Sequence, residues 1–224
     1  SKRHDIGRDA QEAFAIESQT RAAAARESGA FSDEIVAIET SEGTVSEDGC
    51  IRPGTNSEAL SKLRPAFDSN GTVTAGTSSP LTDGAAFVFV CSEEFASEHE
   101  LEPMARIKSI GVSGCAPEIM GIGPVSASQK ALERADLSLN DIDLIELNEA
   151  FAAQSLAVIG ELGLDTDKVN IEGGAIALGH PLGASGARIT GKAAQLMQKN
   201  GAENALATLC VGGGMGMATV LERV

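Results

Sequence analysis

The spacing of apolar residues predicts a regular succession of strands and helices only in the second half of the chain. There, runs that alternate or are continuously apolar are separated by stretches with helical spacing. The strands are predicted at 106–114 and 143–148 and twice within 205–223, and the helices at 125–135, 149–162 and 185–199. Strands that alternate with helices predict an α/β layered domain, closed by an antiparallel hairpin around Gly212-Gly213-Gly214.

The first hundred residues have fewer regular elements. The spacing predicts, in chain order, a helix over 9–28, a strand over 34–39 and a short helix over 57–63. Near its end, this part contains the nearly continuous apolar run AAFVFVCS at 85–92. Such a run is typical of a strand buried on both faces, so a buried strand is predicted there.

Composition and charge narrow the class of protein. The 224 residues, 42% of them hydrophobic, suffice for one large domain or two small ones. Aromatic residues make up only 3% and glycines number 25, so the core is expected to consist of closely packed Ala, Val, Leu and Ile. A net charge of −15 argues against general nucleic-acid binding, and no apolar run approaches the ~20 residues of a membrane span.

The cysteines argue against a metal centre and against a disulfide framework. Cys50, Cys91, Cys115 and Cys210 include no C-x-x-C pair, and there are only three histidines. This pattern predicts neither a zinc site nor a secreted, disulfide-linked fold, so a reducing, cytoplasmic location is expected.

Three polar residues lie where strands and loops should meet at one edge of the sheet. Asn148 ends a predicted strand, His180 lies in a glycine-rich loop before a helix, and Cys210 ends another predicted strand. In open α/β sheets, ligand chemistry collects at the carboxyl ends of strands. Each residue also has a simpler explanation, as a helix N-cap, an idle loop histidine and an inert core thiol respectively.

The segments around these residues together resemble the three C-terminal motifs of the thiolases. The motifs are NEAFAAQ at 148–154, GHPLGASGARI at 179–189 and CVGGGMG at 210–216. TVTAGTSSPLTDGAA at 72–86 is similar to the coenzyme A contact segment of that family, and MGIGPV at 120–125 to its acyl-pocket turn. Thiolases are acyl-CoA:acetyl-CoA C-acyltransferases, and they act by condensation or by thiolysis.

The resemblance implies a role for each catalytic candidate. His180 would take the proton of a nucleophilic cysteine, and Cys210 would move the proton on the acetyl methyl carbon. Asn148, with His180 and partly through a water, would hold the thioester oxyanion, and the backbone N–H of Gly212 would donate near the reacting centre. These types suit the chemistry, because a tuned thiol exchanges protons near neutral pH and an enolate oxygen needs preorganised donors.

The same resemblance implies binding residues and partners. Ser79 would contact the pantetheine arm, Arg52 the phosphates of coenzyme A, and Met120 and Phe151 the acyl group. Arg52 belongs to a locally positive stretch with Lys62 and Arg64. Coenzyme A would be a substrate, with no other cofactor and no metal, and the full protein would form a homodimer or homotetramer.

The implied fold is the layered αβαβα sandwich of thiolases, represented by its C-terminal half and part of its loop domain. The expected organisation is a partial, coenzyme A-contacting loop domain at 1–81, the last strand and connection of an N-terminal half at 82–100, and a C-terminal domain at 101–224.

The sequence departs from the family pattern at the nucleophile. Thiolases attack with a cysteine on a strand–helix turn of their N-terminal half, and Cys50, Cys91 and Cys115 all lack that context. Three hypotheses follow: part of an ordinary thiolase, a coenzyme A-binding subunit that needs a partner, or a structural descendant. This chain alone is expected to be inactive.

Overall fold

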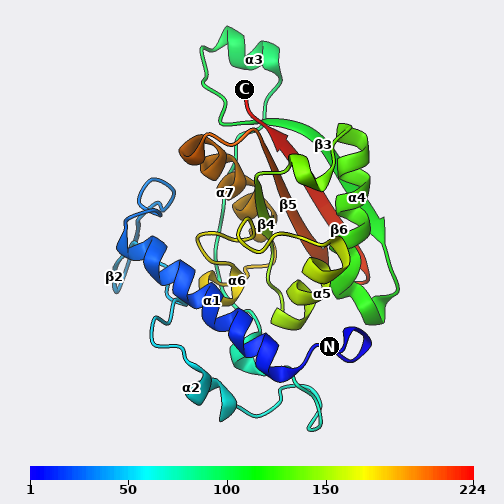
Figure 1. Ribbon diagram of the computed structural model, residues 1–224. Coiled ribbons are helices and arrows are strands. Elements are labelled where there is room, and N and C mark those ends of the chain that lie inside the picture. The colour runs from blue at the N-terminus through cyan, green and yellow to red at the C-terminus, as the bar shows by residue number, and fades with distance from the viewer.

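The computed structural model describes all 224 residues and builds the second half of the chain around a four-stranded sheet (Figure 1). The strands are β3 (Arg106–Gly114), β4 (Leu144–Leu147), β5 (Asn204–Val211) and β6 (Met215–Glu222). Their order is β3-β6-β5-β4, in which β4 and β5 run parallel and β6 is antiparallel to both of its neighbours. The predicted α/β fold with its closing hairpin is therefore confirmed.

Helices cover both faces of this sheet. α4 (Gly123–Ala135) and α5 (Ala152–Leu162) pack on one face, and α7 (Ser185–Asn200) packs on the other (Figure 1). Successive side chains of β6 point to opposite faces of the sheet: Val220 packs in the core beneath α4, and Leu221 packs in the core beneath α7. Gly111 allows β3 to pack closely against α4. A Cβ added to it would clash with a backbone oxygen of α4 at 2.1 Å.

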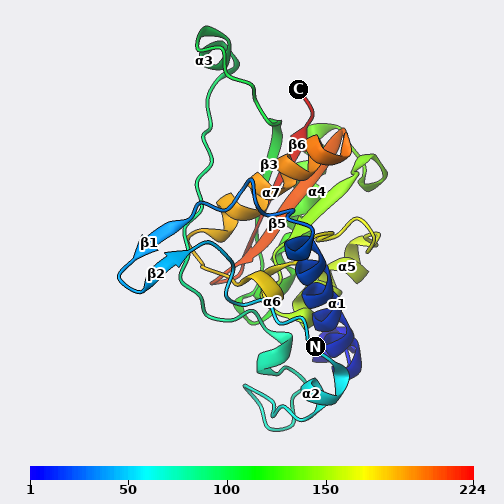
Figure 2. The ribbon, with the colours of Figure 1, turned by 90° about the vertical axis from the view of Figure 1, so that its left-hand side faces the viewer.

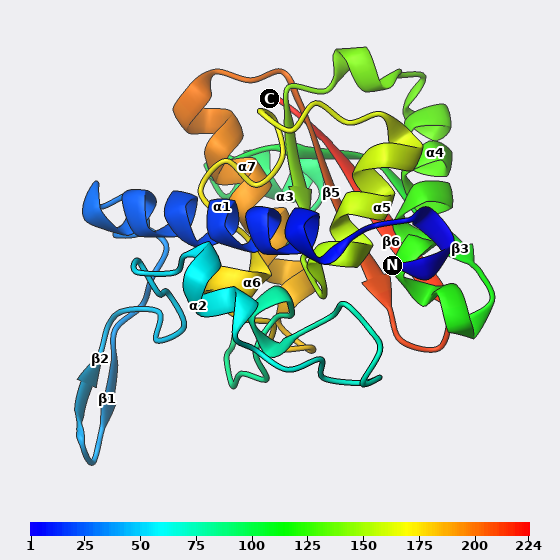
Figure 3. The ribbon, with the colours of Figure 1, turned by 60° about the horizontal axis from the view of Figure 1, so that its bottom comes forward.

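The first helix, α1 (Arg8–Glu27), crosses the end of this layered unit near α5 and the short α6 (Ala175–Leu178) (Figure 3). Hydrogen bonds from polar side chains of α1 hold the helix in this position. Gln19 donates from Nε2 to the carbonyl of Ile176 at 3.2 Å, and Arg21 donates from Nη1 to the carbonyl of Val169 at 2.6 Å. α1 is thus part of the compact body, although it is remote from it in sequence.

The rest of the N-terminal half has little regular structure. β1 (Ile38–Thr40) and β2 (Gly43–Val45) form a small projecting hairpin, and α2 (Ser57–Ser61) is a short helix (Figure 2). The strand predicted at 34–39 is therefore wrong in its bounds, because the backbone pairing of the hairpin begins only at Ile38. Short 3-10 turns complete the chain, at Lys2–His4 (η1), Ala75–Thr77 (η2), Pro117–Ile122 (η3) and Leu139–Asp141 (η4).

The buried strand predicted at 85–92, within the expected connection 82–100, does not form. These residues have no strand partner and lead through an extended connection to the projecting α3 (Glu93–Glu98) (Figure 2). The side chain of Phe87 is 87% exposed and that of Phe89 is 61% exposed. A strand exists only with a neighbour to accept its backbone hydrogen bonds, and no other segment of the chain supplies one.

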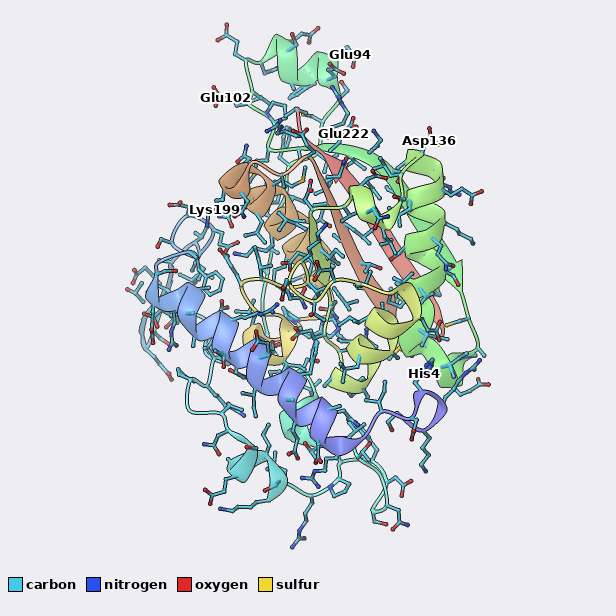
Figure 4. All side chains as sticks on the ribbon, viewed as in Figure 1. His4, Glu94, Glu102, Asp136, Lys199 and Glu222 are labelled. Atoms are coloured by element: carbon cyan, nitrogen blue, oxygen red, sulfur yellow. The ribbon has the colours of Figure 1, made fainter.

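Charged residues occupy the outer ends of the elements. Asp136 directly follows α4, Lys199 lies in the last turn of α7 and Glu222 ends β6, while Glu94 lies on the projecting α3 (Figure 4). None of the helices combines the length and hydropathy that crossing a bilayer requires.

Candidate active site

The sheet topology brings Asn148 and Cys210 to the same edge. Leu147 on β4 pairs with Thr208 on the parallel strand β5, and the backbone N–H of Asn148 donates to the carbonyl of Thr208 at 2.9 Å. Cys210 follows two residues later on β5. Both residues therefore lie at the carboxyl ends of adjacent parallel strands, where the sequence placed them.

The glycine-rich loop carries His180 to the same place. Gly179 adopts φ +96°, a conformation that other residues rarely adopt, immediately before the histidine. The backbone N–H of His180 donates to Oγ1 of Thr82 at 2.8 Å, and its ring nitrogen Nε2 lies 3.3 Å from Nδ2 of Asn148. The structure therefore brings Asn148 and His180, two of the predicted catalytic residues, into direct contact.

The environment of His180 favours the neutral imidazole. Burial lowers its pKa below the ordinary value, and the positive charge of Arg188 lowers it further. A neutral imidazole has an unprotonated nitrogen, so His180 is suited to accept a proton at neutral pH.

Cys210 is buried at 6% exposure, and its environment favours the protonated thiol. Burial raises its pKa to about 11; a backbone hydrogen bond opposes this rise, and the nearby Cys115 adds to it. In this state Cys210 is a proton donor, and it becomes a base only when a bound group stabilises its thiolate.

Gly212 begins the turn between β5 and β6. The next two residues, Gly213 and Gly214, have φ of +90° and +96°, and the carbonyl of Gly214 accepts from the backbone N–H of Cys115 at 2.7 Å. Gly212 itself is exposed, and a Cβ added to it would meet no atom within 4 Å. Its backbone is therefore accessible to a ligand.

The predicted coenzyme A segment lies against the NEAF motif. Ser79 donates to the carbonyl of Ala150 twice, from its backbone N–H at 3.1 Å and from Oγ at 3.2 Å. Ser78 forms an isolated antiparallel bridge with Phe151, whose ring packs edge-on against Phe67 at 5.9 Å between centroids.

The acyl-pocket candidates Met120 and Phe151 both lie close to the start of α5. Phe151 directly precedes this helix. Met120 lies in η3, where a Cβ added to Gly121 would lie 3.0 Å from the side chain of Gln154 on α5. The two half-buried side chains therefore belong to neighbouring elements.

Arg52 lies next to α1, and its neighbour Ile51 shares a hydrophobic cluster with Ala177 of α6. Its backbone N–H donates to Oε1 of Gln19 at 2.6 Å, and its exposed guanidinium makes no ion pair with the chain. Within the positive stretch predicted around it, Lys62 pairs with Glu58 at 2.7 Å.

An open hollow of about 550 Å³ adjoins His180. Its lining consists of Leu81, Thr82, Asp83, His180 and Leu182. The predicted coenzyme A segment and the histidine loop thus share one hollow at the site.

Several residues that organise the site were not predicted from the sequence. Ser185 lies 2.6 Å from Nδ1 of His180, and Thr82 holds the histidine backbone. Glu149 accepts hydrogen bonds from Ser18, Asn170 and the backbone of Ile176. The one signal in the sequence for the contact between Ser185 and His180 is their proximity, because Ser185 begins α7 only five residues after His180.

Glu146 is the second buried carboxyl group beneath the site. Burial raises its pKa to about 8, although Arg188 and Lys192 act in the opposite direction. One of its carboxyl oxygens has no hydrogen-bond partner. No group of three or more His, Cys, Asp or Glu side chains is arranged to hold a metal ion.

Comparison with known families and proteins shows what the chain is similar to. Residues 101–223 match the family described as "Thiolase, C-terminal domain", and residues 1–94 match "Thiolase, N-terminal domain". Among curated proteins, the acetyl-CoA acetyltransferase of Chromobacterium violaceum is 51% identical over 99% of this chain and 58% of its own length. The 3-ketoacyl-CoA thiolase of Citrobacter koseri is 54% identical over 100% of this chain and 60% of its own length.

Solved structures with the same names match the fold of this chain. Human mitochondrial 3-ketoacyl-CoA thiolase in complex with CoA matches with a TM-score of 0.94 at 45% identity, covering 100% of this chain and 56% of that one. The Bacillus anthracis acetyl-CoA acetyltransferase matches with a TM-score of 0.96 at 47% identity, covering 100% and 58%. The chain spans 58–60% of the length of the two curated relatives. The chain belongs to the thiolase family.

Proposed function

We propose that this chain provides the proton-transfer groups of a thiolase active site, which moves an acyl group between a cysteine thiol and the methyl carbon of acetyl-CoA. The contact between Asn148 and His180 at the sheet edge that also carries Cys210 is the observation that supports it most directly. The relatives named acetyl-CoA acetyltransferase and 3-ketoacyl-CoA thiolase support the same chemistry.

In the proposed reaction, His180 takes the proton of the nucleophilic thiol. The resulting thiolate attacks the thioester carbonyl carbon, and the bond from that carbon to the sulfur of coenzyme A breaks. Coenzyme A then leaves as a thiol with the proton held by His180. A neutral imidazole is needed for the first step, and burial of His180 favours that form.

Cys210 handles the second proton. In condensation its thiolate removes a proton from the methyl of a second acetyl-CoA, and the enolate carbon attacks the enzyme-bound acyl group. The new carbon–carbon bond forms as the acyl–cysteine bond breaks. In thiolysis the Cys210 thiol instead returns a proton to the enolate carbon, and the protonated thiol is the form that burial favours here.

The developing oxyanions require donors that are already oriented. We assign this role to Asn148 and His180, partly through a water, and to the backbone N–H of Gly212. Asn148 is fully buried and its Oδ1 has no partner within the chain, which makes it suited to hold such a water. Losing one oriented donor typically costs about 3–4 kcal/mol of barrier stabilisation.

We propose that the nucleophilic cysteine lies in polypeptide outside these 224 residues. Cys50, Cys91 and Cys115 have no hydrogen bond to His180, whose ring nitrogens have Asn148 and Ser185 as hydrogen-bond partners. The same observation supports a second candidate function, a coenzyme A-binding subunit that becomes active beside a partner. In either case we expect the chain alone to be inactive; under the first candidate the full-length protein forms a homodimer or homotetramer.

For substrate binding we propose Ser79 at the pantetheine arm, Met120 and Phe151 at the acyl group, and Arg52 near the phosphates. The human relative solved in complex with CoA supports coenzyme A as the ligand. Arg52 suits a phosphate contact because its exposed charge is not neutralised by a carboxylate of the chain.

The division of labour is tested in an assembly of this chain with the nucleophile-bearing part of a relative. Cys210→Ser should abolish deuterium exchange at the acetyl methyl of acetyl-CoA but leave acylation of the nucleophile measurable by mass spectrometry. His180→Ala should instead suppress acylation. Equal loss of both steps in both variants would contradict the assignment.

The ligand is tested on the chain itself by calorimetric titration with coenzyme A. Arg52→Glu should weaken binding more at low than at high ionic strength, because salt screens the lost attraction. Arg3→Glu is the matched control, since Arg3 is exposed, forms no ion pair and gives the same change in net charge. Equal effects of the two variants would remove Arg52 from the site.

A further inference from the structure

Ser185 links the imidazole of His180 to the start of α7. It is the first residue of that helix and is completely buried. Its Oγ has two polar neighbours, Nδ1 of His180 at 2.6 Å and the carbonyl oxygen of Pro181 at 3.0 Å. The hydroxyl therefore lies between a group that only accepts and a ring nitrogen that either donates or accepts.

The single hydroxyl proton decides between these two possibilities. The carbonyl of Pro181 has no proton to give, so Ser185 donates to it. The oxygen of Ser185 then accepts from His180, and this requires the proton on Nδ1. The opposite arrangement would leave the oxygens of Ser185 and Pro181 3.0 Å apart with no proton between them.

The other ring nitrogen fits the same assignment. Nδ2 of Asn148, which can only donate, lies 3.3 Å from Nε2 of His180. A proton on Nε2 would face that amide donor, whereas a lone pair accepts from it. Both neighbours of the ring thus favour one tautomer, with Nδ1 protonated and Nε2 unprotonated.

We propose that Ser185 is a positioning residue that fixes the tautomer of His180, so that Nε2, which lies beside Asn148 in the site, is unprotonated. This inference rests on the proposed function of His180 as a base, and it names the group that prepares it. The hydrogen bond at one imidazole nitrogen determines which nitrogen remains available for proton transfer. The side chain of Ser185 is itself held in place, because its hydroxyl donates a hydrogen bond to the carbonyl of Pro181.

The test is ¹⁵N NMR of the imidazole groups in the uniformly labelled chain, recorded at about pH 8, above the ordinary imidazole pKa. The chain has only three histidines, so His4 and His99 serve as internal references for the fold. Two-bond correlations to the ring carbon protons show which nitrogen carries the proton. We expect the wild-type His180 to show the Nδ1-protonated pattern alone.

Ser185→Ala should convert this pattern to a mixture of both tautomers, while the signals of His4 and His99 stay in place. Ser185→Thr, which keeps a hydroxyl, should restore the single pattern. Thr190→Ala is the matched control: Thr190 also lies on α7 and donates to its fourth preceding carbonyl, that of Gly186 at 2.8 Å, but does not contact His180. It should leave the tautomer unchanged.

Two outcomes would overturn the proposal. One is an Nε2-protonated His180 in the wild-type spectrum, a result that does not depend on whether any variant folds. The other is an unchanged Nδ1-protonated pattern in Ser185→Ala. Because no substrate is involved, these results are independent of the proposed thiolase reaction: a fixed tautomer with no acylation in the reconstituted enzyme would instead count against the proposed function.

Discussion

The segments 101–224 and 28–100 both contain strongly apolar stretches, yet these stretches reach very different degrees of burial. In 101–224, each strand has a hydrogen-bonded neighbour and both faces of the sheet carry helices, so two large cores close. In 28–100, the most apolar stretch remains exposed because no strand is available beside it. Apolar sequence therefore predicts burial only where the chain also supplies the partner.

The largest expected difference between these segments is in the free energy of unfolding. Leu206 on β5 is completely buried between the sheet and α4, so Leu206→Ala should cost about 2–5 kcal/mol, through lost transfer energy and a residual cavity. Phe87→Ser should change the value by less than about 0.5 kcal/mol, because the ring is already in water. Urea denaturation followed by circular dichroism measures both. A comparable loss in Phe87→Ser would show that 85–92 is buried in solution.

The second prediction concerns the junction between α1 and the layered unit. Glu149 is buried and accepts from Ser18 at 2.7 Å, from Asn170 at 2.8 Å and from the backbone of Ile176 at 3.1 Å. Glu149→Ala leaves three buried donors without an acceptor and should cost about 3 kcal/mol. Ser18→Ala removes one donor to Glu149 and the acceptor of the Gly174 backbone N–H, and it should cost about 1–2 kcal/mol.

Amide hydrogen exchange separates this junction from the core. In Glu149→Ala, protection should fall first in α1 and around α6, while the amides of β5 and β6 retain their relative order. Loss of protection throughout the sheet, with no prior loss in α1, would mean that Glu149 supports the core rather than the junction.

The third prediction is a pH dependence within the layered unit. The pKa of Glu146 is raised to about 8 in the folded chain, so between the ordinary carboxyl pKa and pH 8 the folded state binds more protons than the unfolded state. The free energy of unfolding therefore falls as pH rises, by at most about 1.4 kcal/mol per pH unit from this group. Glu146→Gln should remove this slope.

Between about pH 7 and 8 the comparison with Glu146→Gln gives the share of Glu146 alone, because burial also raises the pKa of Glu149 and that group is present in both chains. The lowered pKa of His180 makes stability rise with pH, but only below the ordinary imidazole pKa of about 6.5. Denaturant midpoints at several pH values in this window measure the slope. An equal slope in wild type and Glu146→Gln would show that the carboxyl group is ionised in the folded chain.

The sequence predicts elements well where local signals suffice. β3 matches its predicted bounds of 106–114, and α7 ends before Gly201, whose φ is +64°. α5, however, begins at Ala152 rather than at the predicted 149. Asn148 and Glu149 are held by β5, by α1 and by the loop between α5 and α6, and these tertiary contacts override the helical spacing.

In the candidate site, too, the features set by local sequence were predicted and those set by tertiary contacts were not. The sequence predicts the strand ends and the glycine-rich loop, and the structure brings Asn148 and His180 together. The roles of Ser185, Thr82 and Glu149 depend on which hydrogen-bonding groups meet after folding, and their spacing in the sequence does not determine that. The raised pKa of Glu146 likewise arises from burial by distant segments.

The smallest expected effect is a gain in stability from a glycine substitution in α5. Gly160 lies within this helix, and a Cβ added to it would meet no atom within 4 Å. Gly160→Ala should raise the free energy of unfolding by about 0.4–1 kcal/mol, because alanine loses less backbone entropy in a helix. Gly54→Ala, in the N-terminal loops, also meets open space and reduces the entropy of the unfolded chain in the same way. If the loops of 28–100 open before the layered unit unfolds, the loop substitution should leave the main denaturation midpoint unchanged while Gly160→Ala shifts it upward. Equal upward shifts in the two variants would show that the two segments unfold as one cooperative unit, despite their different burial.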